Sequence, residues 1–174
     1  MENQVLQAIA DRRSIRGYTD QPLTEEEIRT LMDVGMQSPS ARNSQPWHFT
    51  FCTNQELIRK VNEGAYTAMG REPFDIFYAA PLVVFISASD ESFFNKLDCG
   101  IAVENLALAA HAMGLGSVIL GLPKPAFDGE GGEALKKALC FPEGHEFMIA
   151  ISIGHPDRTK PAHPWLEGRI DRVD

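Results

Sequence analysis

The sequence predicts an α+β domain in which a sheet of four or five strands is flanked by helices. Strand-like apolar runs occur at residues 47–52, 82–86, 117–120 and 147–153. Between these runs, apolar residues recur at helical spacing, so both kinds of element are present along the chain. The chain has 174 residues, and no repeat, linker or change in composition divides it. We therefore expect one domain over residues 1–174, long enough to bury most of a single core.

The composition limits the classes of partner. With 44% hydrophobic and 23% charged residues, the chain resembles an ordinary water-soluble globular protein. Its formal net charge of −8 argues against nucleic acid or an anionic membrane as the main partner. Any basic cluster must therefore be local, and the most compact one contains Arg12, Arg13 and Arg16.

The cysteines and the first residues bear on the compartment. Cys52, Cys99 and Cys140 are widely spaced and form no CxxC pair, which fits free thiols in a reducing compartment. The first thirteen residues lack the basic and then apolar pattern of a signal peptide. The longest apolar runs are too short to cross a bilayer. We expect a cytoplasmic location and no membrane partner.

The first half of the chain predicts three helices. Apolar residues at helical spacing within residues 5–9 predict an amphipathic helix that ends near the arginine cluster. Thr24 is suited to cap a second helix, because residues 25–27 are all glutamates and favour the positive end of a helix dipole. Asn54 is suited to cap a third, short helix. Residues 64–78 are aromatic and irregular, and no element is predicted there.

The second half begins with a central strand and a long helix. Residues 82–86 are apolar on both faces, as expected for a central strand. The pattern from about residue 94 to residue 113 is apolar nearly all round, which predicts a buried helix that also serves as an oligomer interface. A strand, a helix near residues 133–139 and a last strand follow. Residues 155–174, rich in proline and charge, predict an extended tail that becomes ordered only against a partner.

Two polar segments carry the chemistry. Residues 38–47, SPSARNSQPW, disfavour both helix and strand. They suit either an ordinary turn or a loop that binds a small ligand at the start of a buried strand. The cluster Arg12, Arg13, Ser14 and Arg16 places three guanidinium groups and a hydroxyl close together, which suits a phosphate group. The alternative is a solvated helix end whose arginines offset the dipole.

Together the two segments resemble the nitroreductase family of flavin-dependent oxidoreductases, in which an RRSxR-like segment and a PSxxNxQPW-like loop contact FMN. Further likeness at residues 100–121 and 150–156 extends the resemblance over most of the chain. It implies a mainly antiparallel sheet flanked by helices, in an intertwined homodimer with two identical FMN sites. It also implies NADH or NADPH as the diffusible electron donor and a small molecule as the acceptor.

The resemblance assigns roles to the basic residues. Arg12 and Ser14 would hold the FMN phosphate, with Arg13 close by. Arg16 would lie near the pyrimidine side of the flavin, where two-electron reduction places negative charge. Arg169 would complete the phosphate site from the tail, with an exposed surface role as the alternative.

The resemblance also assigns polar-loop and backbone contacts. Pro39, Ser40 and Asn43 match residues that reach the ribityl chain and the flavin edge from the other subunit. Leu120 and Gly121 stand where the family offers backbone N–H groups towards flavin N5. The glycines of residues 114–121 follow a helix and lead into a strand, which is the reverse of the order in a dinucleotide-binding fingerprint.

The implied activity is a ping-pong reaction. NADH or NADPH would pass hydride to flavin N5, and a nitroaromatic, quinone or similar flat acceptor would then use the same pocket. The cofactor carries the redox chemistry, so no catalytic acid or base is expected, and the histidines show no metal-binding spacing. Two alternatives stay open: a reductive dehalogenase or flavin-cleaving enzyme of the same superfamily, and a flavin-binding redox sensor without turnover.

Overall fold

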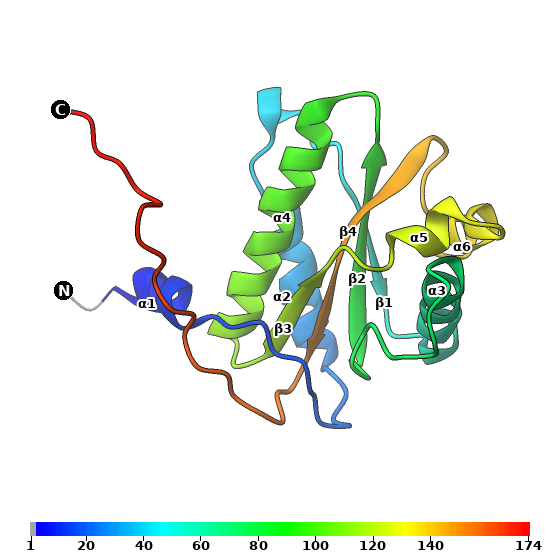
Figure 1. Cartoon of the computed structure of the whole chain (residues 1–174), viewed down its shortest axis with the longest axis horizontal. Helices are drawn as coiled ribbons and strands as arrows, with labels where there is room; N and C mark the ends of the chain where they lie inside the picture. The colour runs from blue at the N-terminus through cyan, green and yellow to red at the C-terminus, as the bar shows by residue number, and fades with distance from the viewer. Residues whose placement is uncertain (1–2) are drawn as a thin grey trace.

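Four strands form one antiparallel sheet in the computed structural model, which describes residues 3–174 (Figure 1). The strands are β1 (His48–Cys52), β2 (Leu82–Ser89), β3 (Gly116–Leu120) and β4 (His145–Gly154). Their spatial order is β1-β2-β4-β3, so β2 and β4 are central and β1 and β3 are edges. All neighbouring pairs are antiparallel. The predicted α+β class and the antiparallel sheet are confirmed.

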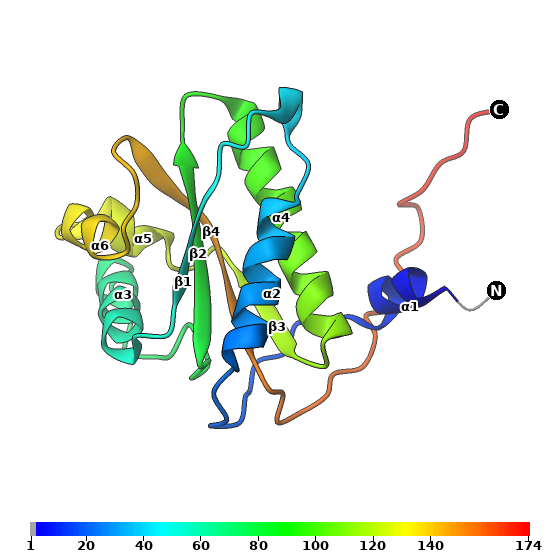
Figure 2. The same cartoon turned by 180° about the vertical axis from the view of Figure 1, so that it is seen from behind.

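Helices cover both faces of this sheet. The helices are α1 (Gln4–Asp11), α2 (Glu25–Met36), α3 (Gln55–Ala68), α4 (Phe93–Ala112), α5 (Lys124–Asp128) and α6 (Gly132–Ala138), with a short 3-10 turn η1 (Ala41–Asn43). Figures 1 and 2 show α2 and α4 on one face and α3, α5 and α6 on the other. The central β2 strand is consequently covered on both sides.

The alternation of side chains along β2 builds two cores. Val83 and Phe85 face α3 and α5, whereas Leu82, Val84 and Ile86 face α2 and α4. All five are fully buried. This confirms the central strand that the continuous apolar run predicts.

Side-chain caps fix where α2 and α3 begin. Thr24 Oγ1 accepts a hydrogen bond from the Glu27 N–H at 3.2 Å, and the Glu27 carboxylate accepts one from the Thr24 N–H at 2.7 Å. This reciprocal pair is the predicted capping box. Asn54 Oδ1 accepts from the Leu57 N–H at 3.1 Å, which confirms the predicted start of α3.

Helix α1 and the C-terminal tail stand away from the body of the molecule, on the same side (Figure 1). The first helix ends at Asp11, as predicted, but none of its residues is buried. Its apolar residue Val5 is 66% exposed, and in the extended tail Trp165 is 85% exposed. A single chain therefore leaves apolar side chains at both ends uncovered.

The long helix α4 is buried on one side and uncovered on another in a single chain. Leu106 and Ala107 are fully buried against the sheet, but Phe94, Leu97 and Ile101 are exposed. The exposed residues lie three and four positions apart, so they share one side of the helix. None of the helices described for residues 3–174 has the length and apolarity needed to cross a bilayer.

Candidate functional site

The segment after α1 lies along the outer edge of the sheet. The Ile15 N–H donates to the Ser117 carbonyl at 2.8 Å, and Ser14 and Ser117 form an isolated parallel bridge. The buried Tyr18 hydroxyl donates to the Ile15 carbonyl at 2.9 Å and lies 3.2 Å from the Ser152 carbonyl. Burial raises the pKa of Tyr18, so the phenol stays neutral and able to donate. These contacts fix the arginine cluster beside β3.

The first two arginines of the cluster have different partners. Arg12 Nε lies 3.2 Å from Glu104 Oε1 of α4, and the Arg12 side chain is 26% exposed. Arg13 Nη1 donates to the carbonyls of Ala10 and Arg12, both at 2.7 Å. Arg13 thus donates to carbonyls at the end of α1. This agrees with the alternative interpretation of the cluster, in which its arginines serve the end of a helix.

Two clefts meet at this cluster and bring predicted residues together with the tail. One cleft of about 480 Å³ is lined by Arg12, Arg13, Ser14 and tail residues 160–164. The other, of about 380 Å³, shares both arginines and Lys160 and reaches the start of β3. Lys160 is a cation that the sequence analysis missed, because a single lysine in a proline-rich tail carries no motif.

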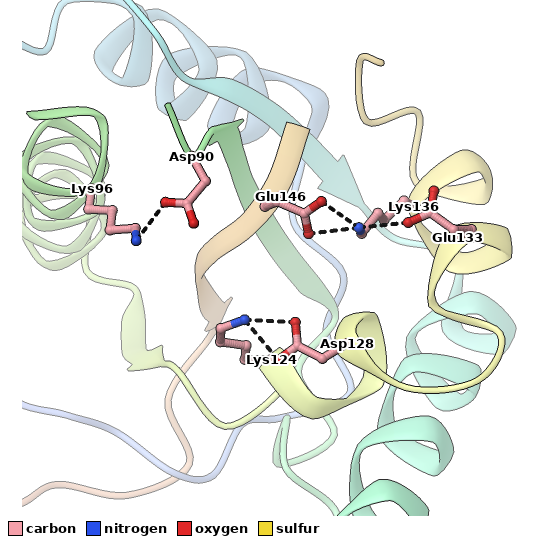
Figure 3. Close-up of polar contacts among 7 residues, drawn as sticks. All are labelled: Asp90, Lys96, Lys124, Asp128, Glu133, Lys136 and Glu146. Atoms are coloured by element: carbon pink, nitrogen blue, oxygen red, sulfur yellow. Dashed lines mark hydrogen bonds and ion pairs between the residues drawn. The ribbon is translucent and has the colours of Figure 1, made fainter. Parts of the chain in front are cut away.

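Most lysines outside this region are neutralised by carboxylates. Lys124 pairs with Asp128, Lys96 pairs with Asp90, and Lys136 contacts both Glu133 and Glu146 (Figure 3). Among residues 3–174, neither Arg13 nor Lys160 forms an ion pair with a carboxylate. Arg13 and Lys160 are therefore available to an external anion, whereas Arg12 already pairs with Glu104.

Arg16 lies apart from the clefts and stacks on an aromatic ring. Its Cζ atom is 5.9 Å from the ring centroid of Tyr78, a cation–π contact. Tyr78 and Ala79 both have positive φ angles, 59° and 54°. The Asp75 carboxylate holds this turn by accepting from the N–H groups of Phe77 and Ala79. Tyr78 belongs to the segment in which the sequence predicted no element, so its contact with Arg16 was missed.

The polar loop has a backbone that needs outside support. Arg42, Asn43 and Gln45 have φ angles of 56°, 54° and 47°, and left-handed conformations cost roughly 1–2 kcal/mol per residue. Within the loop, the Gln45 N–H donates to Ser40 Oγ at 3.0 Å. Pro39 and Asn43 are exposed, and Asn43 Oδ1 accepts a hydrogen bond from Gln45 Nε2 at 3.1 Å.

Helix α4 supplies further contacts to this loop. The Ala41 N–H lies 3.1 Å and 3.2 Å from the two carboxylate oxygens of Asp98. Asn105 Nδ2 donates to Ser38 Oγ at 3.1 Å. Trp47 is buried at the end of the loop.

Within one chain the loop and the arginine cluster do not meet. The end of α1 faces His111, near the last turn of α4, whereas the loop contacts Asp98 in the first half of that helix. Figures 1 and 2 show the two segments at different ends of α4. One chain therefore contains two separated parts of the predicted site.

The end of β3 provides an open edge of backbone. The Leu120 side chain is 7% exposed, whereas Gly121 is exposed and a Cβ atom placed there would meet nothing within 4 Å. A flat ligand can approach the Gly121 backbone without a clash, so the predicted backbone contacts of both residues stay predictions. Arg169 is exposed in the tail and does not line either cleft.

Comparisons with known proteins agree with this arrangement. The model of the nitroreductase family matches residues 9–155. A protein of Archaeoglobus fulgidus with the provisional name NADH dehydrogenase/NAD(P)H nitroreductase is 35% identical over 159 residues, covering 89% of this chain and 87% of the relative. An NADPH-flavin oxidoreductase of Vibrio harveyi is 28% identical over 183 residues, covering 97% of this chain and 72% of the relative. The solved structure of a nitroreductase with bound FMN from Desulfitobacterium hafniense has a TM-score of 0.93 and 27% identity, and all of both chains is covered.

Proposed function

Because the chain belongs to the nitroreductase family, we propose that it is an FMN-dependent oxidoreductase that passes electrons from NADH or NADPH to flat acceptors such as quinones and nitroaromatics. The observation that carries this proposal is the cationic cluster beside the edge strand β3, in a chain whose fold matches an FMN-bound relative over its whole length. A phosphate dianion needs such a set of local donors.

The residues present fit the phosphate end of FMN. Arg12 and Ser14 are assigned to the phosphate, with Arg13 close by and Lys160 of the tail as an additional cation. Their common cleft supports this assignment. Guanidinium groups suit the task because they keep their charge when a bound ligand excludes water. Arg169 is a further candidate for the phosphate, although the tail would have to bring it closer to the cleft.

The ring end of FMN is assigned to Arg16 and to the end of β3. Arg16, held against Tyr78, would place positive charge near the pyrimidine ring. The backbone N–H groups of Leu120 and Gly121 would face the ring edge at N5. When bound, FMN supplies the exchange of two electrons between a nicotinamide and an acceptor, and the protein orients both partners and shapes the pocket.

A homodimer would complete each site. The loop of residues 38–47 lies away from the arginine cluster of its own chain, so Pro39, Ser40 and Asn43 would contact the cofactor bound to a second copy. The uncovered apolar residues of α1, of α4 and of the tail support this assembly, because burial of apolar surface drives association. Two identical sites would then form across the two-fold axis.

The test begins with the absorbance spectrum of the purified protein, which should show a bound flavin. Steady-state oxidation of NADH and of NADPH is then measured with a quinone, a nitroaromatic and a halotyrosine. Turnover of the first two acceptors supports the proposal, whereas selective release of halide identifies a reductive dehalogenase. A flavin-loaded protein that oxidises neither nicotinamide would be a binding or sensing protein. A colourless, monomeric protein that takes up no added FMN would contradict the proposal that FMN is the cofactor.

A further inference from the structure

Asp98 is a buried carboxylate that accepts hydrogen bonds from the polar loop. It lies in the second turn of α4 with 3% of its surface exposed. Among residues 3–174, its hydrogen bonds come from a single donor, the backbone N–H of Ala41, which is shared between both carboxylate oxygens. A buried carboxylate is costly unless it is hydrogen-bonded. The contact therefore ties the position of η1 to that of α4.

Asn105 holds the same loop at a second point. It follows Asp98 by seven residues, or two helical turns, and so lies on the same face of α4. Its amide donates to the hydroxyl of Ser38, which is 7% exposed. Together the two side chains of α4 hold the loop at Ser38 and at Ala41.

The part of the loop that follows is restrained by hydrogen bonds that lie within the loop itself. Arg42, Asn43 and Gln45 adopt left-handed backbone conformations that side chains disfavour, and such conformations persist where surrounding contacts enforce them. The hydrogen bonds of Gln45 with Ser40 and Asn43, and the backbone bonds of residues 40–44, all join one part of the loop to another. They do not fix the loop relative to the helix. The contacts to Asp98 and Asn105 do so.

From this geometry we propose that Asp98 and Asn105 are positioning residues of the flavin site, acting through the loop that presents Pro39, Ser40 and Asn43 to the cofactor. The inference rests on the proposed function, because it assumes that the loop meets the flavin. The loop is assigned to the ribityl chain and the ring edge, whereas Arg12 is assigned to the phosphate. Asp98 and Asn105 should therefore affect binding of the ribityl chain and the ring, whereas Arg12 should affect binding of the phosphate.

The test uses FMN and riboflavin, which differ by the phosphate. Deflavinated wild-type protein and its Asp98→Ala variant are titrated with each flavin by fluorescence quenching. Asp98→Ala should weaken binding of both flavins by the same factor, roughly tenfold. Arg12→Ala should weaken binding of FMN far more than that of riboflavin. Asp98→Asn, which keeps an oxygen to accept from the Ala41 N–H, should recover most of the affinity. Asn105→Ala repeats the test at Ser38 if the Asp98→Ala variant does not fold.

The matched control is Asp90→Ala. Asp90 is an exposed carboxylate just before α4 and pairs with Lys96 of that helix (Figure 3), whereas the carboxylate of Asp98 accepts from the loop. This variant should bind both flavins like the wild type. Equal affinities for Asp98→Ala, Asp90→Ala and wild type, all as folded protein, would overturn the inference.

A second readout does not depend on flavin. Trypsin cleaves after the exposed Arg42 of the loop and after the exposed Arg169 of the tail, so the ratio of the two rates in one sample reports the stability of the loop. Asp98→Ala should raise this ratio several-fold in flavin-free protein, and Asp98→Asn should restore it. An unchanged ratio would show that Asp98 does not hold the loop. If wild-type protein binds neither flavin, the proposed function fails, and the cleavage ratio still decides whether Asp98 anchors the loop.

Discussion

Arg12 Nε lies 3.2 Å from Oε1 of Glu104, so the guanidinium assigned to the FMN phosphate already has an anionic partner on α4. The same helix holds the polar loop through Asp98 and Asn105. Both segments assigned to the cofactor therefore contact the same helix: the arginine cluster at Glu104, and the loop at Asp98 and Asn105. In a homodimer, the position of each α4 would set the distance between the two parts of a site.

Removing the guanidinium of Arg12 should weaken FMN binding specifically. A hydrogen bond to a charged group contributes about 1.5–3 kcal/mol, so Arg12→Ala should lower FMN affinity about tenfold or more. Riboflavin affinity should change little, because riboflavin lacks the phosphate. Flavin content after purification and titration of the apoprotein measure both effects. Arg29→Ala, at an exposed arginine of α2, is the control, and a full FMN complement in Arg12→Ala would disprove the phosphate assignment.

Replacing Glu104 by glutamine should strengthen FMN binding. Glutamine keeps an oxygen that can accept from Arg12 but removes a negative charge that would repel the phosphate. Like charges about 4 Å apart interact by about 1 kcal/mol where water surrounds them. Because the pair is partly exposed, a gain of a few-fold is expected, and it should shrink as salt is added. Stability should hardly change, because the pair is partly exposed, with Glu104 44% exposed. Weaker FMN binding by Glu104→Gln would mean that the carboxylate mainly orients Arg12.

The sequence predicted elements well where the periodicity was strong and failed where glycine had a packing role. Helix α3 runs to Ala68, but only a short helix was predicted, because Gly64 and the aromatic residues after it indicated irregular structure. A Cβ atom at Gly64 would lie 3.2 Å from the Cβ of Ala126, so this glycine permits close approach of α5 and does not end the helix. The short helix α5 itself was missed, because Pro125 near its start indicated a turn.

The sequence indicated the motifs of the candidate site, but it did not indicate the long-range contacts that hold these motifs in place. The arginine cluster and the polar loop are each contiguous in sequence, so their chemistry is visible without a structure. Asp98 contacts Ala41 across 57 positions of the sequence, and no local pattern indicates such a bond. The contact of Arg16 with Tyr78 likewise depends on a turn held by Asp75, where neither glycine nor proline marks the bend.

His145, at the end of the sheet, should make the stability of the fold depend on pH. His145 Nδ1 lies 3.3 Å from Ser87 Oγ, and its ring centroid is 6.4 Å from that of His48. Burial lowers the pKa of His145, the nearby His48 lowers it further, and a hydrogen bond with the Ser87 backbone opposes the shift. The folded state thus disfavours the protonated form of His145.

The melting temperature should consequently fall as the pH drops below about 6.5, the ordinary pKa of histidine. Below that value His145 binds a proton in the unfolded chain more readily than in the folded protein. The free energy of unfolding therefore decreases as the pH falls. Melting curves between pH 7 and pH 5 measure this slope and stay above the range in which Glu27, whose pKa is lowered mainly by its bond with the Thr24 backbone, titrates. His145→Gln should flatten the slope, whereas His163→Gln, in the exposed tail, should not. An unaltered slope in His145→Gln would assign the pH dependence to other groups.

A charge on the uncovered side of α4 should prevent assembly and, with it, flavin binding. Ile101 is 43% exposed in a single chain and lies beside the exposed Leu97. If this side is buried in a homodimer, Ile101→Asp would bury a carboxylate without a partner, at a cost of several kcal/mol. Sedimentation should then show monomers, and FMN occupancy should fall although Arg12 and Ser14 are intact, because the loop of the second copy is absent. Ala138→Asp, at an exposed position of α6 on the opposite face of the sheet, should leave both assembly and occupancy unchanged. A monomeric Ile101→Asp protein that keeps its full FMN content would show that one chain suffices for the site.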